Sequence, residues 1–93
     1  MQITQVPGTK GADIMLYALS TCPWCRKTKK LLDDLGVAYS YLFVDLLSES
    51  DSETAMAAVK PWNASLSFPT MVINKKFSIV GFKEDEIRQA LGK

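Results

Sequence analysis

Cys22 and Cys25 are the residues of this chain best suited to chemistry, because two thiols separated by two residues can form and break a disulfide. A disulfide that closes so short a loop constrains the unfolded chain little, so the spacing favours reactivity over a structural cross-link. Zinc normally takes four Cys, His or carboxylate ligands, and this chain has two cysteines and no histidine. These counts argue against a zinc site within one chain. A metal cluster shared between two chains remains an open alternative.

The segment around the cysteines is predicted to pass from a strand into a helix. Residues 13–19 form a nearly continuous apolar run of strand length, suited to a strand that is covered on both faces. Leucines at helical spacing follow, and Gly36 is a natural stop, so we expect a helix over about 23–35. Pro23 fits the first helical position, which makes Cys22 the N-cap.

This placement predicts different roles for the two thiols. The free N–H groups and positive end of the helix favour a thiolate at Cys22, which we expect to be the low-pKa nucleophile. Cys25 lies about one turn inside the helix and is expected to be the resolving thiol. Four basic residues follow Cys25: Arg26, Lys27, Lys29 and Lys30. They either make the surroundings of the thiols electropositive or form a solvated helix face with Asp33 and Asp34 as ion-pair partners.

The rest of the chain alternates between strand-like and helix-like patterns. The predicted order βαβαββα contains a parallel βαβ unit and an antiparallel hairpin, which gives an α/β fold with a four-stranded mixed sheet and helices on both faces. After the first helix we expect a strand at 39–44, a capping box at 50–53 leading into a helix at 54–60, a hairpin of strands 71–73 and 77–80, and a last helix from Glu84.

Length and composition indicate one small domain. The chain has 93 residues and a formal net charge of +1, so a strong basic surface for nucleic acid is not expected. No run approaches the roughly 20 apolar residues that span a bilayer, and the first residues lack a secretion signal pattern, so we expect a cytoplasmic protein that contacts no membrane. We also expect a monomer. Residues 1–12 are expected to be an N-terminal arm or a weak extra strand, and residues 13–93 the domain.

Three motifs together give the chain a family resemblance from about Asp13 onwards. They are Cys22-Pro23-Trp24-Cys25 after a strand, Phe68-Pro69-Thr70 before Met71-Val72-Ile73, and Val80-Gly81-Phe82 before an acidic helix. In these motifs the chain resembles glutaredoxins and, in its C-terminal third, NrdH-redoxins. The resemblance implies a thioredoxin-like fold and a thiol-disulfide oxidoreductase that reduces the disulfides of proteins or small molecules and holds no tightly bound cofactor.

The resemblance also implies a substrate-binding surface around the cysteines. Pro69 would be cis and lie beside them, and the backbone of Phe68 would pair with a bound peptide or with glutathione. Trp24 would cover the disulfide or meet partners, and Thr21 would help to hold the approach to Cys22. Gly81 and Phe82 complete the predicted set.

Two departures from the glutaredoxin pattern bear on the electron donor. Glutathione-binding members commonly carry Lys or Arg three positions before the first cysteine, where this chain has Leu19. Their Gly-Gly pair and polar cap are replaced by Val80-Gly81-Phe82-Lys83, which resembles the NrdH-redoxins. NrdH-redoxins are reduced by a flavoenzyme that resembles thioredoxin reductase. The resemblance therefore implies an external electron donor, either thioredoxin reductase with NADPH or a low-molecular-weight thiol other than glutathione. A glutathione-dependent glutaredoxin and an iron-sulfur cluster-binding module are the alternatives.

Overall fold

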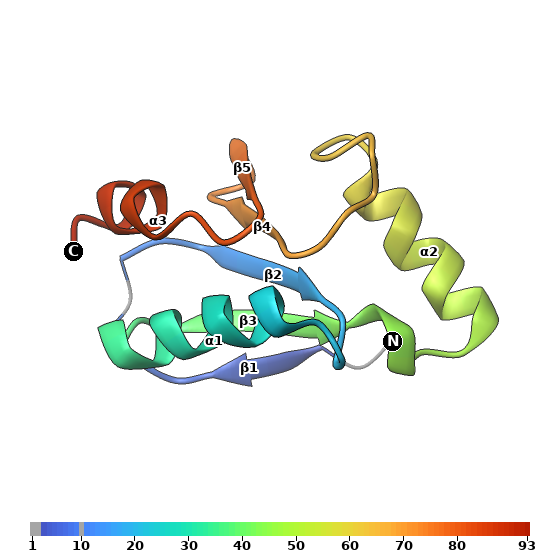
Figure 1. Cartoon of the computed structure of the whole chain (residues 1–93), viewed down its shortest axis with the longest axis horizontal. Coiled ribbons are helices and arrows are strands. Elements are labelled where there is room, and N and C mark those ends of the chain that lie inside the picture. Colours follow the sequence, from blue (N-terminus) through green and yellow to red (C-terminus); the bar gives the residue numbers. More distant parts are fainter. Residues whose placement is uncertain (1–2, 10) are drawn as a thin grey trace.

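The computed structural model describes residues 3–9 and 11–93, and its strands form one mixed sheet with helices packed against it (Figure 1). The sheet order is β1-β3-β2-β4-β5, in which β2 and β3 are parallel and the other neighbours antiparallel. The predicted βαβ unit and hairpin are thus confirmed. The elements are β1 (Thr4–Val6), β2 (Ile14–Ala18), α1 (Pro23–Leu35), β3 (Tyr39–Phe43), the 3-10 turn η1 (Val44–Leu46), α2 (Glu49–Val59), β4 (Thr70–Ile73), β5 (Phe77–Val80) and α3 (Glu84–Leu91).

The sheet has five strands rather than four, because the N-terminal segment, expected to be an arm or a weak extra strand, contributes one. The additional strand is β1, which pairs antiparallel with β3 and sets Val6 opposite Tyr39. Three residues are too few for an alternating pattern to stand out in a sequence. After β1 the chain runs close to the end of α1, where the N–H of Thr9 donates to the carbonyl oxygen of Gly36 at 2.8 Å.

Helix α1 begins and ends where its sequence predicts. Cys22 is the N-cap and Pro23 the first helical residue, and Gly36 ends the helix in the left-handed region with φ of 70°. Its buried side chains are Cys25, Thr28, Leu31 and Leu32. On the exposed face Lys29 and Lys30 pair with Asp33 and Asp34, at 3.3 and 2.8 Å, so these two lysines belong to a solvated helix face.

Helix α2 begins earlier than predicted. Ser48 rather than Ser50 is the N-cap, and its hydroxyl oxygen accepts the N–H of Asp51 at 3.3 Å. Both serines precede acidic residues, so the sequence offers two similar N-terminal signals within three positions. The preceding strand is also shorter than predicted, because Val44 already belongs to η1.

The two faces of the sheet carry separate apolar clusters. Alternate residues of β2, from Ile14 to Ala18, pack with Leu32 of α1 and Ile87 of α3, whereas Met15 and Tyr17 pack with the cluster that contains Ala55 of α2. Helices α1 and α3 therefore cover one face and α2 the other (Figure 1). This layering fixes the end of β2 and the start of α1, where the cysteines lie.

Candidate active site

Cys22 lies in the loop that joins β2 to the N-terminus of α1. Its backbone N–H donates to the carbonyl oxygen of Leu19 at 3.2 Å, which folds the loop back on the strand. Its Sγ accepts the backbone N–H of Cys25 at 3.2 Å. The residue is half-buried, and its sulfur faces a helix N–H donor. A thiolate formed here is stabilised by that donor and by the helix dipole.

Cys25 lies behind Cys22 and is almost completely covered, with 1% of its surface exposed. Burial raises the pKa of the Cys25 thiol to about 12, and the hydrogen bond to Cys22, the negative charge of Cys22 and that of Asp45 act in the same direction. A backbone hydrogen bond from Leu19 acts in the opposite direction and lowers it. In the reduced protein Cys25 is consequently a protonated, shielded thiol.

Asp45, in η1, holds the loop that leads to Cys22. Its carboxylate accepts the backbone N–H of Ser20 at 2.8 Å and also the Ser20 hydroxyl. Desolvation works against the charged form, but these hydrogen bonds from Ser20 keep the pKa of the Asp45 carboxyl below its usual range. Sequence reasoning missed Asp45, because it is 25 positions from its partner and shows no local signal.

An aromatic pair lies at the exposed end of the site. The ring of Trp24, whose side chain is 55% exposed, stacks against Phe82 with the centroids 6.3 Å apart. Lys27 Nζ lies 4.6 Å from the centroid of the Trp24 ring, within the range of a cation–π contact. The structure therefore brings Phe82, from the segment before α3, together with the residue between the two cysteines.

The segment that enters β4 lies at the same end of the sheet as the loop that carries Cys22. Thr70 pairs with Tyr17, so the residues just before Thr70 lie level with those just after Tyr17. The Phe68–Pro69 peptide bond is cis, as the resemblance implied. Pro69 is buried, and its carbonyl oxygen accepts the N–H of Gly81, which has φ of 85°, at 2.9 Å. Phe68 packs against both apolar clusters, including the one that contains Cys25.

Four other residues that the sequence analysis or the donor argument singles out lie in the loop before Cys22, in the core or at the surface. Thr21 is exposed in the loop before Cys22. Leu19 packs into the cluster on the α2 face, where it contributes to the core. Lys83 lies 3.8 Å from Glu86 in an exposed ion pair at the start of α3. Trp62 is half-buried, and its carbonyl oxygen accepts the Ser78 hydroxyl, which agrees with a packing role.

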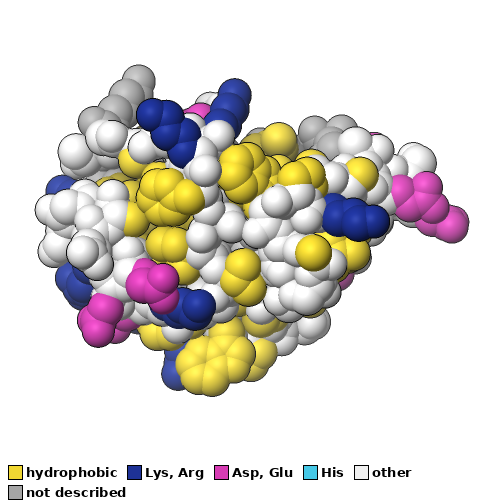
Figure 2. All heavy atoms as spheres, turned by 90° about the horizontal axis from the view of Figure 1, so that it is seen from above, with side chains coloured by type: hydrophobic (Ala, Val, Ile, Leu, Met, Phe, Trp, Pro, Cys, Tyr) yellow, Lys and Arg dark blue, Asp and Glu magenta, His cyan; other side chains and the backbone are white. Residues whose placement is uncertain are grey.

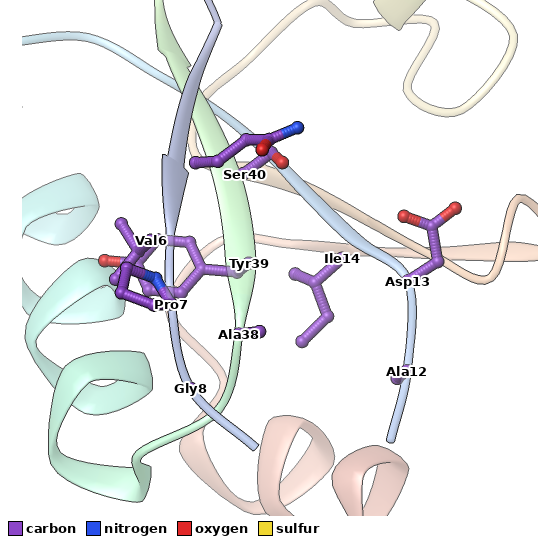
Figure 3. Close-up of a pocket in the computed structure, with 10 residues that line it drawn as sticks. Val6, Pro7, Gly8, Ala12, Asp13, Ile14, Ala38, Tyr39 and Ser40 are labelled. Atoms are coloured by element: carbon purple, nitrogen blue, oxygen red, sulfur yellow. The ribbon is translucent and has the colours of Figure 1, made fainter. Parts of the chain in front are cut away.

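A cavity at the N-terminal arm lies away from the thiols. Its volume is about 430 Å³, and it lies between the arm at Pro7 and Gly8 and the strand residues Ile14 and Tyr39 (Figure 3). These residues are near the start of β2, at the opposite end of the strand from Cys22 (Figure 1). Figure 2 shows hydrophobic side chains spread over the face that carries α3 and β5.

In the part of the chain that the structure describes, no group of three or more His, Cys, Asp or Glu side chains is arranged to hold a metal ion. None of the helices in residues 3–9 and 11–93 is long and apolar enough to cross a membrane.

The fold and the site together define a thioredoxin-like domain that carries a dithiol at the N-terminus of its first helix. The glutaredoxin family model matches residues 14–78. The chain therefore belongs to the glutaredoxin family, whose members are thiol-disulfide oxidoreductases.

Curated relatives agree with this assignment. A glutaredoxin-C6 of Oryza sativa subsp. japonica is 32% identical over 70% of this chain and 56% of its own length, and a glutaredoxin of Ricinus communis is 33% identical over 68% and 60%. The match thus spans somewhat more than half of each relative.

Solved structures cover more of the chain. A glutaredoxin from Methanosarcina mazei is 48% identical with a TM-score of 0.91, over all of this chain and 90% of that one. The methanoredoxin of Methanosarcina acetivorans is 56% identical with a TM-score of 0.85, over 87% and 85%. A complex of buckwheat glutaredoxin with glutathione is 27% identical with a TM-score of 0.66, over 88% and 72%.

Proposed function

We propose that this protein reduces the disulfides of proteins or small molecules through Cys22 and Cys25. An external electron donor other than glutathione then reduces the Cys22–Cys25 disulfide again. The carrying observation is the asymmetry of the two thiols. Cys22 presents a half-exposed sulfur at a helix N-terminus, and Cys25 lies 1% exposed behind it. An accessible nucleophile backed by a shielded thiol is the arrangement that disulfide exchange requires.

The exchange takes place in two steps. The Cys22 thiolate attacks one sulfur of the substrate disulfide, which forms a mixed disulfide and releases the other sulfur as a thiolate. Cys25 then loses its proton and attacks Cys22 Sγ, which forms the Cys22–Cys25 disulfide and releases the second substrate thiolate. Two electrons pass from the protein to the substrate. A donor must return them before another turnover.

Formation of the mixed disulfide also prepares Cys25 for the second step. While Cys22 is a free thiolate, its hydrogen bond and its negative charge both help to raise the pKa of Cys25. A mixed disulfide at Cys22 carries no charge, so both contributions are lost. The resolving thiol therefore becomes easier to ionise once its target bond has formed.

Leu19 and the Val80–Lys83 segment support a donor other than glutathione. A charge-assisted hydrogen bond contributes roughly 1.5–3 kcal/mol, and Leu19 can make none. Its side chain packs into the core cluster on the α2 face instead. At the other side, Phe82 presents an aromatic ring that stacks on Trp24. We infer that a flavin-dependent reductase using NADPH, or a small thiol with a different charge pattern, supplies the electrons.

Glutathione is the second candidate donor. The buckwheat glutaredoxin-glutathione complex shares the fold and 27% of its aligned residues with this chain, which keeps glutathione in the comparison. Arg26 and Lys83 are exposed cationic side chains that would compensate in part for Leu19 if either reaches the ligand.

A donor comparison tests the proposal. Turnover of a disulfide substrate is measured with glutathione and glutathione reductase, with NADPH and thioredoxin reductase, and with another small thiol such as coenzyme M. We expect one of the last two to be the fastest. Leu19→Lys should increase the glutathione-driven rate about tenfold, the low end of the value of a charged hydrogen bond, and leave the reductase-driven rate nearly unchanged.

Leu19→Gln is the matched control, because it removes the same apolar packing without adding a charge. If the wild-type protein already works with glutathione at a low half-saturating concentration, and Leu19→Lys adds nothing, the glutathione-dependent function replaces the one proposed. The visible absorption spectrum of the purified protein tests the cluster-binding alternative, since an iron-sulfur cluster is coloured and a dithiol is not.

A further inference from the structure

The loop between α2 and β4 is organised by one buried side chain, that of Asn63. The loop leaves α2 at Val59, whose carbonyl oxygen accepts the backbone N–H of Asn63 at 2.9 Å. It then turns through Leu66, a non-glycine residue with φ of 54°, before it reaches Phe68. Asn63 is 8% exposed, although it belongs to a surface loop.

The amide of Asn63 joins both sides of this turn. Its Oδ1 accepts the backbone N–H and the hydroxyl of Ser65, at 3.2 and 2.7 Å. Its Nδ2 faces three acceptors, each at 3.0 Å: the carbonyl oxygen of Ser67, the hydroxyl of Ser67 and Oγ1 of Thr70. Thr70 Oγ1 in turn donates to the carbonyl oxygen of Ser67 at 2.8 Å.

Ser67 and Thr70 are the residues on either side of Phe68–Pro69. The amide therefore holds both ends of this dipeptide, whose Phe68 packs against the apolar cluster that contains Cys25, and it does so from a buried position where hydrogen bonds are costly to break. Within the described residues, the backbone N–H and C=O of Phe68 have no hydrogen-bond partner. Unpaired backbone groups in an extended segment such as this one, just before β4, can form hydrogen bonds with an extended peptide.

We propose that Asn63 is a positioning residue, which fixes the backbone of Phe68 where it can pair with the peptide chain that flanks a substrate disulfide. This inference rests on the proposed function and adds a substrate class to it. A protein disulfide has a backbone to offer, and a small organic disulfide has none. Asn63 should therefore matter for the first kind of substrate and not for the second.

Two substrates separate this role from a general one. The reduced protein is assayed with insulin as the protein disulfide and with 2-hydroxyethyl disulfide as the small one, with dithiothreitol as donor and its uncatalysed rate subtracted. Asn63→Ala should raise KM for insulin about tenfold, the equivalent of one hydrogen bond lost from the bound complex, and should leave kcat within about twofold. Its rate with 2-hydroxyethyl disulfide should equal that of the wild type.

Thr70→Val provides a second, milder variant. It keeps the volume and β-branching of a buried strand residue and removes only the hydroxyl that links Asn63 to Ser67. It should raise KM for insulin in the same direction. The double variant should be no worse than Asn63→Ala alone, because both substitutions break one network.

Two control variants complete the design. Ser65→Ala removes the hydroxyl that donates to Asn63 Oδ1 and lies 3.4 Å from Ser67 Oγ, but it keeps the backbone N–H bond to Oδ1 and all three Nδ2 contacts, so KM should stay nearly unchanged. Ile73→Val removes one buried methyl group at the far end of β4 and should lower the melting temperature without changing KM.

The outcomes separate the two proposals. An unchanged insulin KM in both Asn63→Ala and Thr70→Val would overturn the positioning role, as would an equal loss with both substrates or an equal effect of Ile73→Val. A wild-type protein that reduces neither disulfide would instead overturn the proposed function itself.

Discussion

The two thiols of the reduced protein should differ by orders of magnitude in their reaction with an alkylating reagent. A thiolate, not a thiol, is the reacting species. With a pKa of about 12, Cys25 is ionised to roughly one part in 100,000 at pH 7. A free cysteine derivative with a pKa of about 8.5 is ionised to roughly 3% at that pH. Ionisation alone thus makes Cys25 about three-thousandfold less reactive than free cysteine, and its burial slows the reaction further.

Iodoacetamide and mass spectrometry of the digested protein measure this difference directly. The fully reduced protein is sampled over time at several pH values between about 5 and 9, with N-acetylcysteine in the same buffer as the reference thiol. We expect the label on Cys22 alone throughout this range. Cys25→Ser should be labelled at a rate close to that of the wild type, and Cys22→Ser should be labelled at least a hundredfold more slowly than N-acetylcysteine.

The same variants test the roles of the thiols in turnover. Cys22→Ser should abolish the reduction of every disulfide, whereas Cys25→Ser should trap a mixed disulfide on Cys22 that a mass measurement detects. Faster labelling of Cys25 than of Cys22 in the reduced protein would reverse the assignment of nucleophile and resolving thiol. It would also contradict the burial of Cys25 on which the argument depends.

Two further predictions concern Asp45 and the N-terminal arm. Asp45→Asn should lower the pKa of Cys25, because it removes a negative charge that raises this pKa. The thiolate absorbance of Cys25, measured against pH in a Cys22→Ser background, gives the direction of the shift. A pKa that stays the same or rises would contradict the charge argument. Gly8→Ala should destabilise the protein by about 1–3 kcal/mol, since a Cβ at Gly8 would lie 2.5 Å from the carbonyl carbon of Val37. Denaturant unfolding measures this loss of stability. Turnover with 2-hydroxyethyl disulfide should stay at the wild-type rate, because the contact lies by the C-terminal end of α1, away from Cys22.

Local signals in the sequence were sufficient for the elements that carry the thiols. Pro23 and Gly36 mark both ends of α1, and each acts through its own backbone conformation, which no distant contact overrides. Strand β1 has no such marker. It exists because β3 offers an edge for pairing, so its signal is in the tertiary structure and not in its three residues.

The contacts of the residues that support the site could not be predicted from the sequence, because they too depend on tertiary structure. Trp24 and Phe82 were each expected near the cysteines, but their stacking depends on how α3 packs against α1. Asp45 meets Ser20 only because parallel pairing brings the ends of β2 and β3 together. Asn63 has its partners nearby in the sequence, yet a polar loop residue gives no sign that its amide points inward.

Leu19 connects the core to the proposed choice of donor. Its carbonyl oxygen accepts the N–H of Cys22, which fixes the loop, while its side chain packs beside Leu42, Val44 and Ala55. A lysine at this position would have to leave that cluster to reach a ligand, or else bury its stem there and extend only the charged end. An apolar residue here therefore stabilises the α2 face and withholds a cation from the site at the same time. Under the proposed function one side chain has both effects, so Leu19→Lys must be read beside Leu19→Gln.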